Sequence, residues 1–281
     1  MNGGILERSL ERARRALRGR RMRRPVGLAL SGGGTLGAAH VGALRALREA
    51  GVPIDYLSGT SIGAVAAALY AFATPIDDIE EIALEMKWLS ISSFSPSRLG
   101  LLTNRRLGDI LREEIGEPDF GEARIPLAVM SADISTGERV VLDSGPVLPA
   151  VMASACVPGI FQPIEHDERL LVDGGIVENL PVAPLRRMGA RTVIAVDLNT
   201  GRRYQRPDDV IDVMLNATDI AINNATRLQV GAGIDLPITP RLGAYNRFRG
   251  GRGAELIDEG YEAARKALAG WHGMHPPRQE D

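Results

Sequence analysis

Ser61 stands at the centre of the run Gly59-Thr60-Ser61-Ile62-Gly63, which has the G-x-S-x-G form. A serine hydroxyl becomes an effective nucleophile for acyl carbonyls when a sharp turn holds it clear of the backbone. The residues two places before and after the serine then approach each other, so both must be small, and both are glycine here. The pattern indicates a nucleophilic Ser61. The alternative is a serine that caps a helix after a tight strand–helix turn.

A run of three glycines forms a second candidate for chemistry. Its N–H groups carry no covering side chains, so the loop can hold an anion. One such anion is a dinucleotide pyrophosphate, because Gly32, Gly34 and Gly37 also fit G-x-G-x-x-G. That site needs an acidic residue at the end of the next strand, which ends instead at Ser61. We therefore prefer the oxyanion of acyl transfer. The candidate N–H donors are those of Gly32, Gly33, Gly34, Thr35 and Ile62.

An aspartate provides the candidate base. Asp173 follows the apolar strand 170–172 and precedes Gly174 and Gly175, which let another chain segment approach the carboxylate. An aspartate within hydrogen-bond reach of a serine can take its proton. Because its ordinary pKa is about 3.9, it is a weak base until burial raises that value. Taken alone, Asp-Gly is also a common turn sequence.

The four histidines are weaker candidates for the base. His272 and His275 follow Asp173, as a Ser–Asp–His order requires, but they lie beside two prolines near the chain end. His166 stands in a polar run that is typical of a hairpin tip, and His40 begins the helix after the glycine loop, where we expect a structural role. No cluster has the ligand spacing of a metal site, so neither a metal nor a cofactor is expected.

Strand-like and helix-like segments alternate from residue 25 onward, without an internal repeat or a linker. This alternation predicts an α/β fold, a three-layer sandwich with a mostly parallel central sheet. The expected strands cover residues 26–30, 54–57, 127–132, 139–142, 170–172 and 192–196. The expected helices cover residues 38–50, 64–73, 79–89, 107–115, 146–154, 182–188, 209–228 and 254–269.

Charge is unevenly distributed along the 281 residues, although the net charge is only −2. A basic N-terminal arm covers residues 1–24, and Glu11 is the only acid between Arg8 and Arg24. The arm either contacts an anionic membrane or forms a solvated extension, and without interleaved aromatics it predicts no nucleic-acid binding. A single domain is expected over residues 25–270, followed by a tail over 271–281.

The apolar run 26–30 is too short for the core of a signal peptide. No stretch reaches the ~20 apolar residues of a membrane-spanning helix. Cys156 is the only cysteine, which excludes a disulfide within the chain. We expect a cytoplasmic protein, with peripheral contact at the inner membrane surface through the arm. A Ser-rich segment is expected to form either a lid or part of the core, through Leu89, Ile91, Phe94, Leu99, Leu101 and Leu102.

The three motifs occur in the order found in the patatin-like phospholipase family, which this chain resembles over roughly residues 25–245. Two further stretches, 153–163 and 172–181, resemble blocks of that family, most closely its small bacterial branch related to neuropathy target esterase. The resemblance implies a patatin-like fold and a Ser–Asp dyad, with Ser61 as nucleophile and Asp173 as general base and acid. The supporting glycines of the motifs are Gly37, Gly59, Gly63, Gly174 and Gly175.

The resemblance also implies a serine esterase or lipase that acts on acyl esters of phospholipid or lysophospholipid type. One departure affects the substrate, because the family loop commonly carries Arg or Lys where this chain has Leu36. The change removes a positive charge near the oxyanion but keeps the N–H donors, so a neutral acyl ester also fits. The alternatives are an acyltransferase and a non-catalytic relative that binds a lipid or a protein.

Overall fold

The computed structural model describes residues 24–85, 93–94, 99–100, 102–201, 204, 206–229, 233–247 and 251–271. The basic arm up to residue 23, most of the segment expected as a lid, and the tail from residue 272 lie outside the described residues. The side chain of Phe94 also lies outside them. The expectations for these segments, and the domain boundaries, therefore stay predictions.

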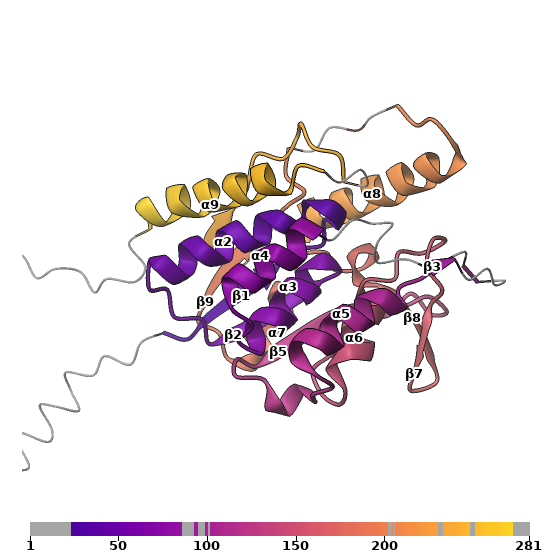
Figure 1. Cartoon of the computed structure of the whole chain (residues 1–281), viewed down its shortest axis with the longest axis horizontal. Helices are drawn as coiled ribbons and strands as arrows, with labels where there is room; N and C mark the ends of the chain where they lie inside the picture. Colours follow the sequence, from indigo (N-terminus) through magenta and orange to yellow (C-terminus); the bar gives the residue numbers. More distant parts are fainter. Residues whose placement is uncertain are drawn as a thin grey trace, which may run out of the picture.

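Eight strands form one mixed sheet in the described part of the chain, in the order β10-β9-β1-β2-β5-β8-β7, with β6 also paired to β5 (Figure 1). The parallel strands are β1 (Val26–Leu30), β2 (Tyr56–Thr60), β5 (Leu127–Asp133), β9 (Thr192–Val196) and β10 (Leu236–Ile238). Three strands run antiparallel to their neighbours: β6 (Arg139–Leu142), β7 (Ile164–His166) and β8 (Arg169–Asp173). A separate pair consists of β3 (Ser93–Phe94) and β4 (Leu102–Thr103).

Helices cover both faces of this sheet, as the sequence predicts (Figure 1). The α-helices are α2 (Ala38–Glu49), α3 (Ile62–Ala71), α4 (Ile76–Glu85), α5 (Arg105–Ile115), α6 (Val147–Ser154), α7 (Val182–Met188), α8 (Val210–Gln229) and α9 (Gly253–Ala269). The short 3-10 helices are η1 (Gly34–Gly37), η2 (Phe120–Glu122) and η3 (Gly174–Ile176). Within the described residues, no helix is long and apolar enough to cross a membrane.

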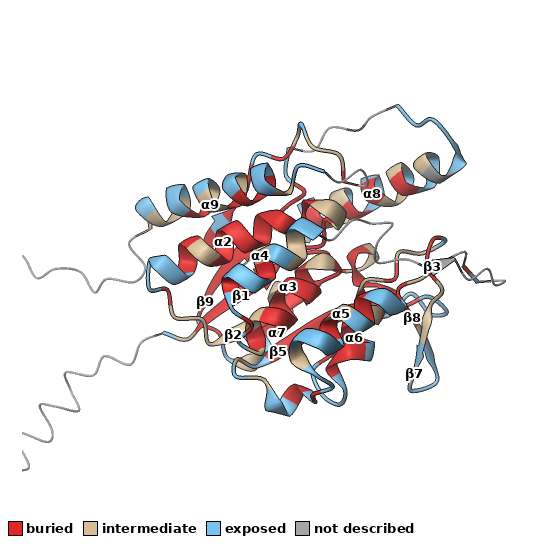
Figure 2. Ribbon diagram, viewed as in Figure 1, coloured by how far each residue is buried: buried red, intermediate tan, exposed pale blue. Residues whose placement is uncertain are grey.

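The core is divided by the sheet, because successive side chains of a strand point to opposite faces. In β1, Leu28 and Leu30 join the large core that includes α2 and α3, whereas Ala29 joins a smaller core with Leu185 of α7. Figure 2 shows the central strands β1, β2, β5 and β9 and helix α3 buried almost throughout, while α9 exposes its outer side. A helix that is buried on all sides suits the Ala-rich sequence of α3, which packs closely between strands and helices.

Two strands meet end to end along one edge of β5. Thr60, the last residue of β2, pairs with Met130 of β5, and Asp173, the last residue of β8, pairs with Ser131. Strand β6 pairs with the same stretch of β5 and so takes the opposite edge. Because β2 runs parallel and β8 antiparallel to β5, their chain ends converge, which brings the residue after Thr60 next to Asp173.

The structure differs from the sequence-based expectation at the end of β2. Ser58 looked like the beginning of a turn, so the strand was expected to end at Leu57, but it continues to Thr60. Both hydroxyls are buried and satisfied: Ser58 donates to the Pro181 carbonyl at 2.6 Å and Thr60 donates to the Glu178 carbonyl at 2.9 Å. Polar residues are tolerated inside a buried strand when such partners exist.

Candidate active site

Ser61 lies on a strained turn between β2 and α3. Its φ is 56° and its ψ is −126°, in a region that residues other than glycine rarely adopt. The turn is anchored by Ser154, whose hydroxyl accepts a hydrogen bond from the Ser61 N–H at 2.8 Å and donates to the Met130 carbonyl at 2.5 Å. The surrounding structure thus holds the Ser61 side chain in one place, with 7% of the residue exposed.

The glycines that flank the serine are required by space. A Cβ atom at Gly59 would lie 2.4 Å from the Gly63 carbonyl oxygen, and one at Gly63 would lie 2.3 Å from the Leu30 carbonyl oxygen. Both contacts are far shorter than a van der Waals distance, and they involve backbone that cannot move aside. The motif glycines therefore let β1, β2 and α3 close around the turn.

Asp173 lies beside Ser61, at the end of β8: both side chains line the same cavity, and the Ser61 hydroxyl is close enough to lower the pKa of the carboxyl group. Its Oδ1 accepts the Gly175 N–H at 2.8 Å, and its own N–H donates to the Cys156 carbonyl at 2.8 Å. Burial raises the pKa of Asp173 above its ordinary value, while the nearby Ser61 hydroxyl, the hydrogen bond from Gly175 and the charge of Arg247 oppose this rise. The result is a stronger base than an exposed aspartate.

The glycine loop reaches the site through η1, but two of its expected donors have other partners. The Gly32 N–H donates to the Asn179 carbonyl at 3.2 Å, and the Thr35 N–H donates to the Arg247 carbonyl at 2.9 Å. An N–H that already donates within the protein is not available to a substrate oxygen. These two residues therefore position the loop in this structure.

The remaining expected donors are Gly33, Gly34 and Ile62. Among the described residues, neither the Gly33 N–H nor the Gly34 N–H donates a hydrogen bond. Ile62 is the first residue of α3, where an N–H has no acceptor within its helix. Gly34 has a φ of 59°, and a Cβ atom there would lie 2.6 Å from the Arg247 carbonyl oxygen. A Cβ atom at Gly37 would lie 2.1 Å from Ile62 Cγ1, so the loop packs directly on α3.

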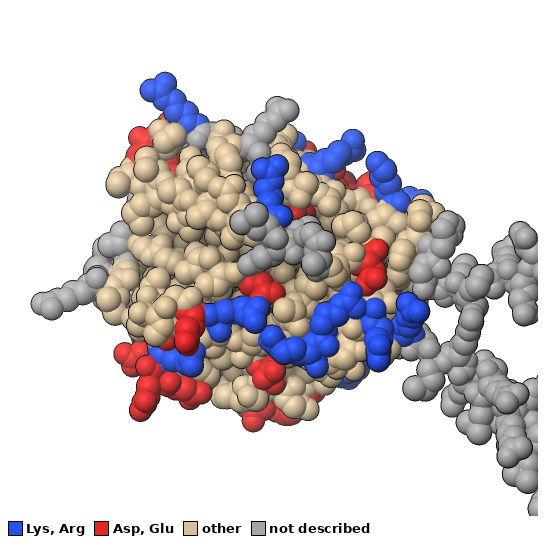
Figure 3. Space-filling view, turned by 180° about the vertical axis from the view of Figure 1, so that it is seen from behind, with Lys and Arg blue, Asp and Glu red and all other residues tan. Residues whose placement is uncertain are grey.

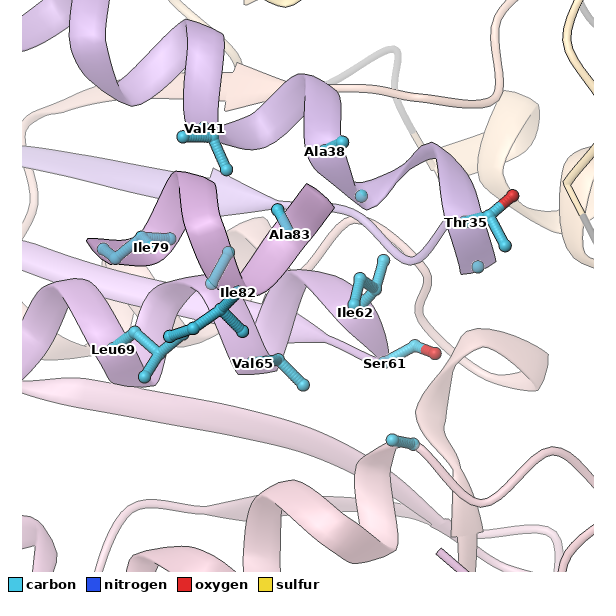
Figure 4. Close-up of a pocket in the computed structure, with 14 residues that line it drawn as sticks. Thr35, Ala38, Val41, Ser61, Ile62, Val65, Leu69, Ile79, Ile82 and Ala83 are labelled. Carbon is cyan, nitrogen blue, oxygen red and sulfur yellow. The ribbon is translucent and has the colours of Figure 1, made fainter. Parts of the chain in front are cut away.

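Two cavities meet at Ser61 and Gly34. The first has about 710 Å³ of empty space, part of it open to solvent, and it extends from Ser61 between α2, α3 and α4 (Figure 4). It is mostly apolar and is lined by Gly34, Thr35, Gly37, Ala38, Val41, Ser61, Ile62, Val65, Ala66, Leu69, Ile79, Ile82, Ala83 and Ala155.

The second cavity has about 410 Å³ of such space and contains charged groups. Its lining includes Asp173 together with Asp219 of α8 and Arg247, which follows β10. The other lining residues are Gly34, Ser61, Val157, Pro158, Ile176, Leu215, Thr218 and Ile222. The site is thus apolar on one side of the serine and charged on the other.

The histidines do not form a triad in the described structure. His40 is fully buried, and its Nε2–H donates to the carbonyl of Ser31 at 2.8 Å, just before the glycine loop. His166 lies in the β7–β8 hairpin, as expected, and His272 and His275 lie outside the described residues. In the part of the chain that is described, no group of three or more His, Cys, Asp or Glu side chains is placed to hold a metal.

Burial lowers the pKa of His40 to about 4, from an ordinary value of 6.5. The unfolded chain therefore binds the proton more readily, so the contribution of neutral His40 to stability is complete above pH 6.5 and is lost as pH falls toward 4. The shift corresponds to about 3 kcal/mol. We expect His40→Gln to lose markedly less stability than wild type between pH 7 and pH 4 in urea unfolding.

His166→Gln is the matched control, since its side chain lies at the hairpin tip. It controls for the loss of an imidazole at a position outside the core. Equal acid sensitivity in the His40→Gln protein would show that His40 does not govern this loss.

Sequence reasoning overlooked three residues of the site. Ser154 appeared only as part of a family-like block, without a role. Asp219 and Arg247 were not singled out, because each lies in a stretch without a motif. Only the fold brings them next to Ser61, from α8 and from the segment after β10.

A model of the patatin-like phospholipase family matches residues 28–186, which is more than half of the chain. This match spans both Ser61 and Asp173. The chain belongs to the patatin-like phospholipase family. Within the family it is related to neuropathy target esterase, as its similarity to NTE-family proteins shows.

Curated patatin-like relatives are similar over 62% of this chain. The Uncharacterized NTE family protein Rv1063c of Mycobacterium tuberculosis is 37% identical over 177 residues, which are 49% of that protein. The Patatin-like phospholipase domain-containing protein 6 of Mus musculus is 34% identical over 191 residues and is matched over 14% of its length. The Lysophospholipase NTE1 of Mycosarcoma maydis is 33% identical over 181 residues and is matched over 10%. This chain therefore spans about half the length of its mycobacterial relative, and far less of the others.

Two solved structures share the patatin-like fold. VipD from Legionella pneumophila superposes with a TM-score of 0.60 at 16% identity, covering 88% of this chain and 67% of its own. ExoU of Pseudomonas aeruginosa, in complex with SpcU, gives a TM-score of 0.52 at 16% identity, covering 90% of this chain and 54% of its own. At such low identity the likeness concerns the fold alone.

Proposed function

We propose that this chain is a serine esterase that hydrolyses acyl esters of lipids. The observation that carries the proposal is the adjacent pair of Ser61 and Asp173, which stands between an apolar cavity and N–H groups that make no hydrogen bond within the described residues. A nucleophile, a base and oxyanion donors are the three parts that acyl transfer requires. Hydrolysis of p-nitrophenyl esters of graded chain length by the wild-type protein tests the proposal.

In the first half of the reaction, Ser61 Oγ attacks the acyl carbonyl carbon and Asp173 accepts the hydroxyl proton. The carbonyl oxygen becomes an oxyanion, and the N–H groups of Gly33, Gly34 and Ile62 stabilise it. When the intermediate collapses, the ester C–O bond breaks and Asp173 gives its proton to the leaving alcohol. Water then attacks the acyl-Ser61 ester, again with Asp173 as base, and regenerates the free serine.

The apolar cavity suits a single acyl chain. It follows α3 from Ser61 to Leu69, which at 1.5 Å per helical residue is about 12 Å. That length accommodates an extended hydrocarbon chain on the order of ten carbons, given ordinary carbon–carbon bond lengths. Figure 4 shows Ser61 at one end of this row, with Leu69 and Ile79 at the other end.

A large side chain at Ala83 of α4 tests this assignment, because Ala83 lines the cavity and is only half-buried. We expect Ala83→Phe to shorten the space for the acyl chain. Losing the burial of two methylenes costs about 1.6 kcal/mol, so kcat/KM for decanoyl esters should fall by about tenfold or more. Acetyl esters should be little affected.

Leu84→Phe is the matched control for this variant. Leu84 is the next residue of α4 and is 44% exposed, away from the lining of the cavity. Its substitution should leave the chain-length profile as in wild type. If Ala83→Phe lowered turnover of short and long esters alike, the cavity would not be the acyl site.

A non-catalytic relative that binds a lipid or a protein is the alternative function. The Leu36 side chain, which replaces the charge common in the family, is fully buried in the core, and the N–H groups of Gly33 and Gly34 beside it make no hydrogen bond within the described residues. This favours an intact catalytic site. Labelling by a fluorophosphonate separates the two functions, because only an activated serine reacts with it.

We also propose membrane contact through the basic arm and a cytoplasmic location. Residues 1–23 of the arm lie outside the described structure. On the rear surface, Figure 3 shows Lys and Arg side chains in a band across the lower half, with acidic side chains next to it. Charges of both signs therefore lie on this face. The arm is the more strongly basic candidate for contact with anionic lipid.

A further inference from the structure

Arg247 and Asp219 form an ion pair inside the protein, at the wall of the second cavity. Arg247 is 7% exposed and Asp219 is 1% exposed. Asp219 is supplied by α8, and Arg247 by the segment after β10. Burying two charges is costly, and replacing such a pair with apolar residues is often neutral or stabilising. Stability therefore does not explain why a buried ion pair lies beside Ser61, and we look for its role in function.

The Arg247 side chain runs along the glycine loop. A Cβ atom placed on Gly34 would lie 2.9 Å from Arg247 Cγ and 3.6 Å from its Nε. The Arg247 carbonyl accepts the Thr35 N–H and the Thr35 hydroxyl, both at 2.9 Å. Backbone contacts thus position residue 247, and the side chain brings a positive charge close enough to lower the pKa of Asp173.

The two cavities suit different parts of an ester substrate, the acyl chain and the leaving alcohol. The lining of the first has no charged side chain, which suits the acyl chain, whereas Asp173 belongs to the lining of the second. Asp173 must deliver a proton to the leaving alcohol, so the alcohol has to lie on its side of Ser61. The group that leaves is consequently the part of the substrate that meets Arg247.

We propose that Arg247, held by Asp219, binds the phosphodiester of the leaving alcohol, so that the protein prefers lysophospholipid or phospholipid esters to neutral acylglycerols. This inference rests on the proposed esterase function and names its substrate class. A guanidinium suits the task because its planar N–H groups match phosphate oxygens and its charge persists at all relevant pH values. Arg247 thus supplies a positive charge near the glycine loop, where the family commonly has Arg or Lys and this chain has Leu36. The charge comes from a residue far along the chain.

The test compares two substrates with the same acyl chain, lysophosphatidylcholine and monoacylglycerol. The double variant Arg247→Gln/Asp219→Asn removes the ion pair without leaving a buried charge behind. We expect the ratio of kcat/KM for the phosphodiester over the neutral ester to fall by about 10- to 100-fold. Arg247→Lys should recover part of the ratio. A ratio equal to that of wild type in the double variant would overturn the inference.

The ratio of the two kcat/KM values isolates the proposed role of Arg247. Damage to the fold or to Asp173 lowers kcat/KM for both substrates by the same factor, so it does not change their ratio. A second measurement needs no turnover: calorimetry of Ser61→Ala protein, with and without the double substitution, against sn-glycero-3-phosphocholine and against inorganic phosphate. We expect the phosphodiester to bind only when Arg247 is present, and more tightly than phosphate. Equal binding of the phosphodiester to both proteins would contradict the inference. Tighter binding of inorganic phosphate than of the phosphodiester would also contradict it, because the ligand of Arg247 would then be a free anion and not a lipid head group.

The two proposals fail in different ways. If the wild-type protein hydrolyses neither substrate, the esterase function is wrong, and calorimetry still decides whether Arg247 binds a phosphodiester. If wild type hydrolyses both substrates with a ratio that does not depend on residue 247, the esterase function stands and the inference about Arg247 falls.

Discussion

Ser61→Ala protein should hydrolyse lipid and p-nitrophenyl esters at least about 10⁴-fold more slowly than wild type, because removing the nucleophile removes the acyl-enzyme route. Only binding and the N–H donors would then contribute to the residual rate. The fold should be unaffected. Alanine at position 61 keeps the Ser61 N–H bond to the Ser154 hydroxyl, and its methyl group fits where the serine Cβ lies. Initial rates and fluorophosphonate labelling measure the loss.

Ser144→Ala is the matched control, since Ser144 is an exposed serine in the turn before α6. It should retain wild-type rates and labelling. Undiminished turnover by the Ser61→Ala protein, or labelling that persists in it, would assign the activity to another residue.

Asp173→Asn should have the second-largest effect on turnover, a loss of about 10²–10⁴-fold, which is typical for removal of a general base. The pKa of Asp173 is raised by burial, so the acid limb of kcat/KM should lie at a higher pH than an ordinary aspartate would give. An acid limb near pH 3.9 would show that burial does not tune this carboxylate.

The same substitution should make the protein more stable at neutral pH. Because the folded pKa of Asp173 exceeds the unfolded value, the folded state holds the proton more tightly, and stability falls as pH rises from about 3.9 through the folded pKa. Above the folded pKa, the free-energy cost of burying the charged carboxylate stays constant. Asparagine carries no such cost and can still accept the Gly175 N–H. Its Tm should therefore exceed that of wild type at pH 7, and the difference should vanish toward pH 4.

A lower Tm for Asp173→Asn at pH 7 would mean that the hydrogen bonds of the carboxylate outweigh its burial. Higher stability with lost turnover would show that the site keeps a costly charge for the sake of catalysis. The rate and the melting temperature should be measured on the same preparation.

The sequence predicts the local geometry of the site because close backbone approach leaves a local signature. Gly59 and Gly63 are spaced as a turn around Ser61 requires, and the structure explains each by a carbonyl that a Cβ would strike. The alternation of strands and helices likewise predicts the layered fold, since hydrophobic period and turn residues are local properties. The pairing of Ser61 with Asp173 as nucleophile and base is implied by the family resemblance, and it stays a prediction.

Contacts between distant segments could not be predicted in this way. Strand β10 has only three residues and contains Pro237, so its sequence carries no strand signal, and pairing with β9 defines it. Arg247 is similar, since nothing near it in the sequence marks it as part of the site. Its position depends on the Thr35 contacts, which connect residues more than two hundred positions apart.

The head-to-head meeting of β2 and β8 on β5 places Asp173, the last residue of β8, beside the turn at Ser61, the residue that follows β2. A shift of β8 by one residue would turn Asp173 to the opposite face and abolish the pair. The pairing of Ser61 with Asp173 is thus coupled to the register of β8 on β5. The loops around the rim do not set this register, so substitutions there can alter the substrate range that we propose without separating Ser61 from Asp173.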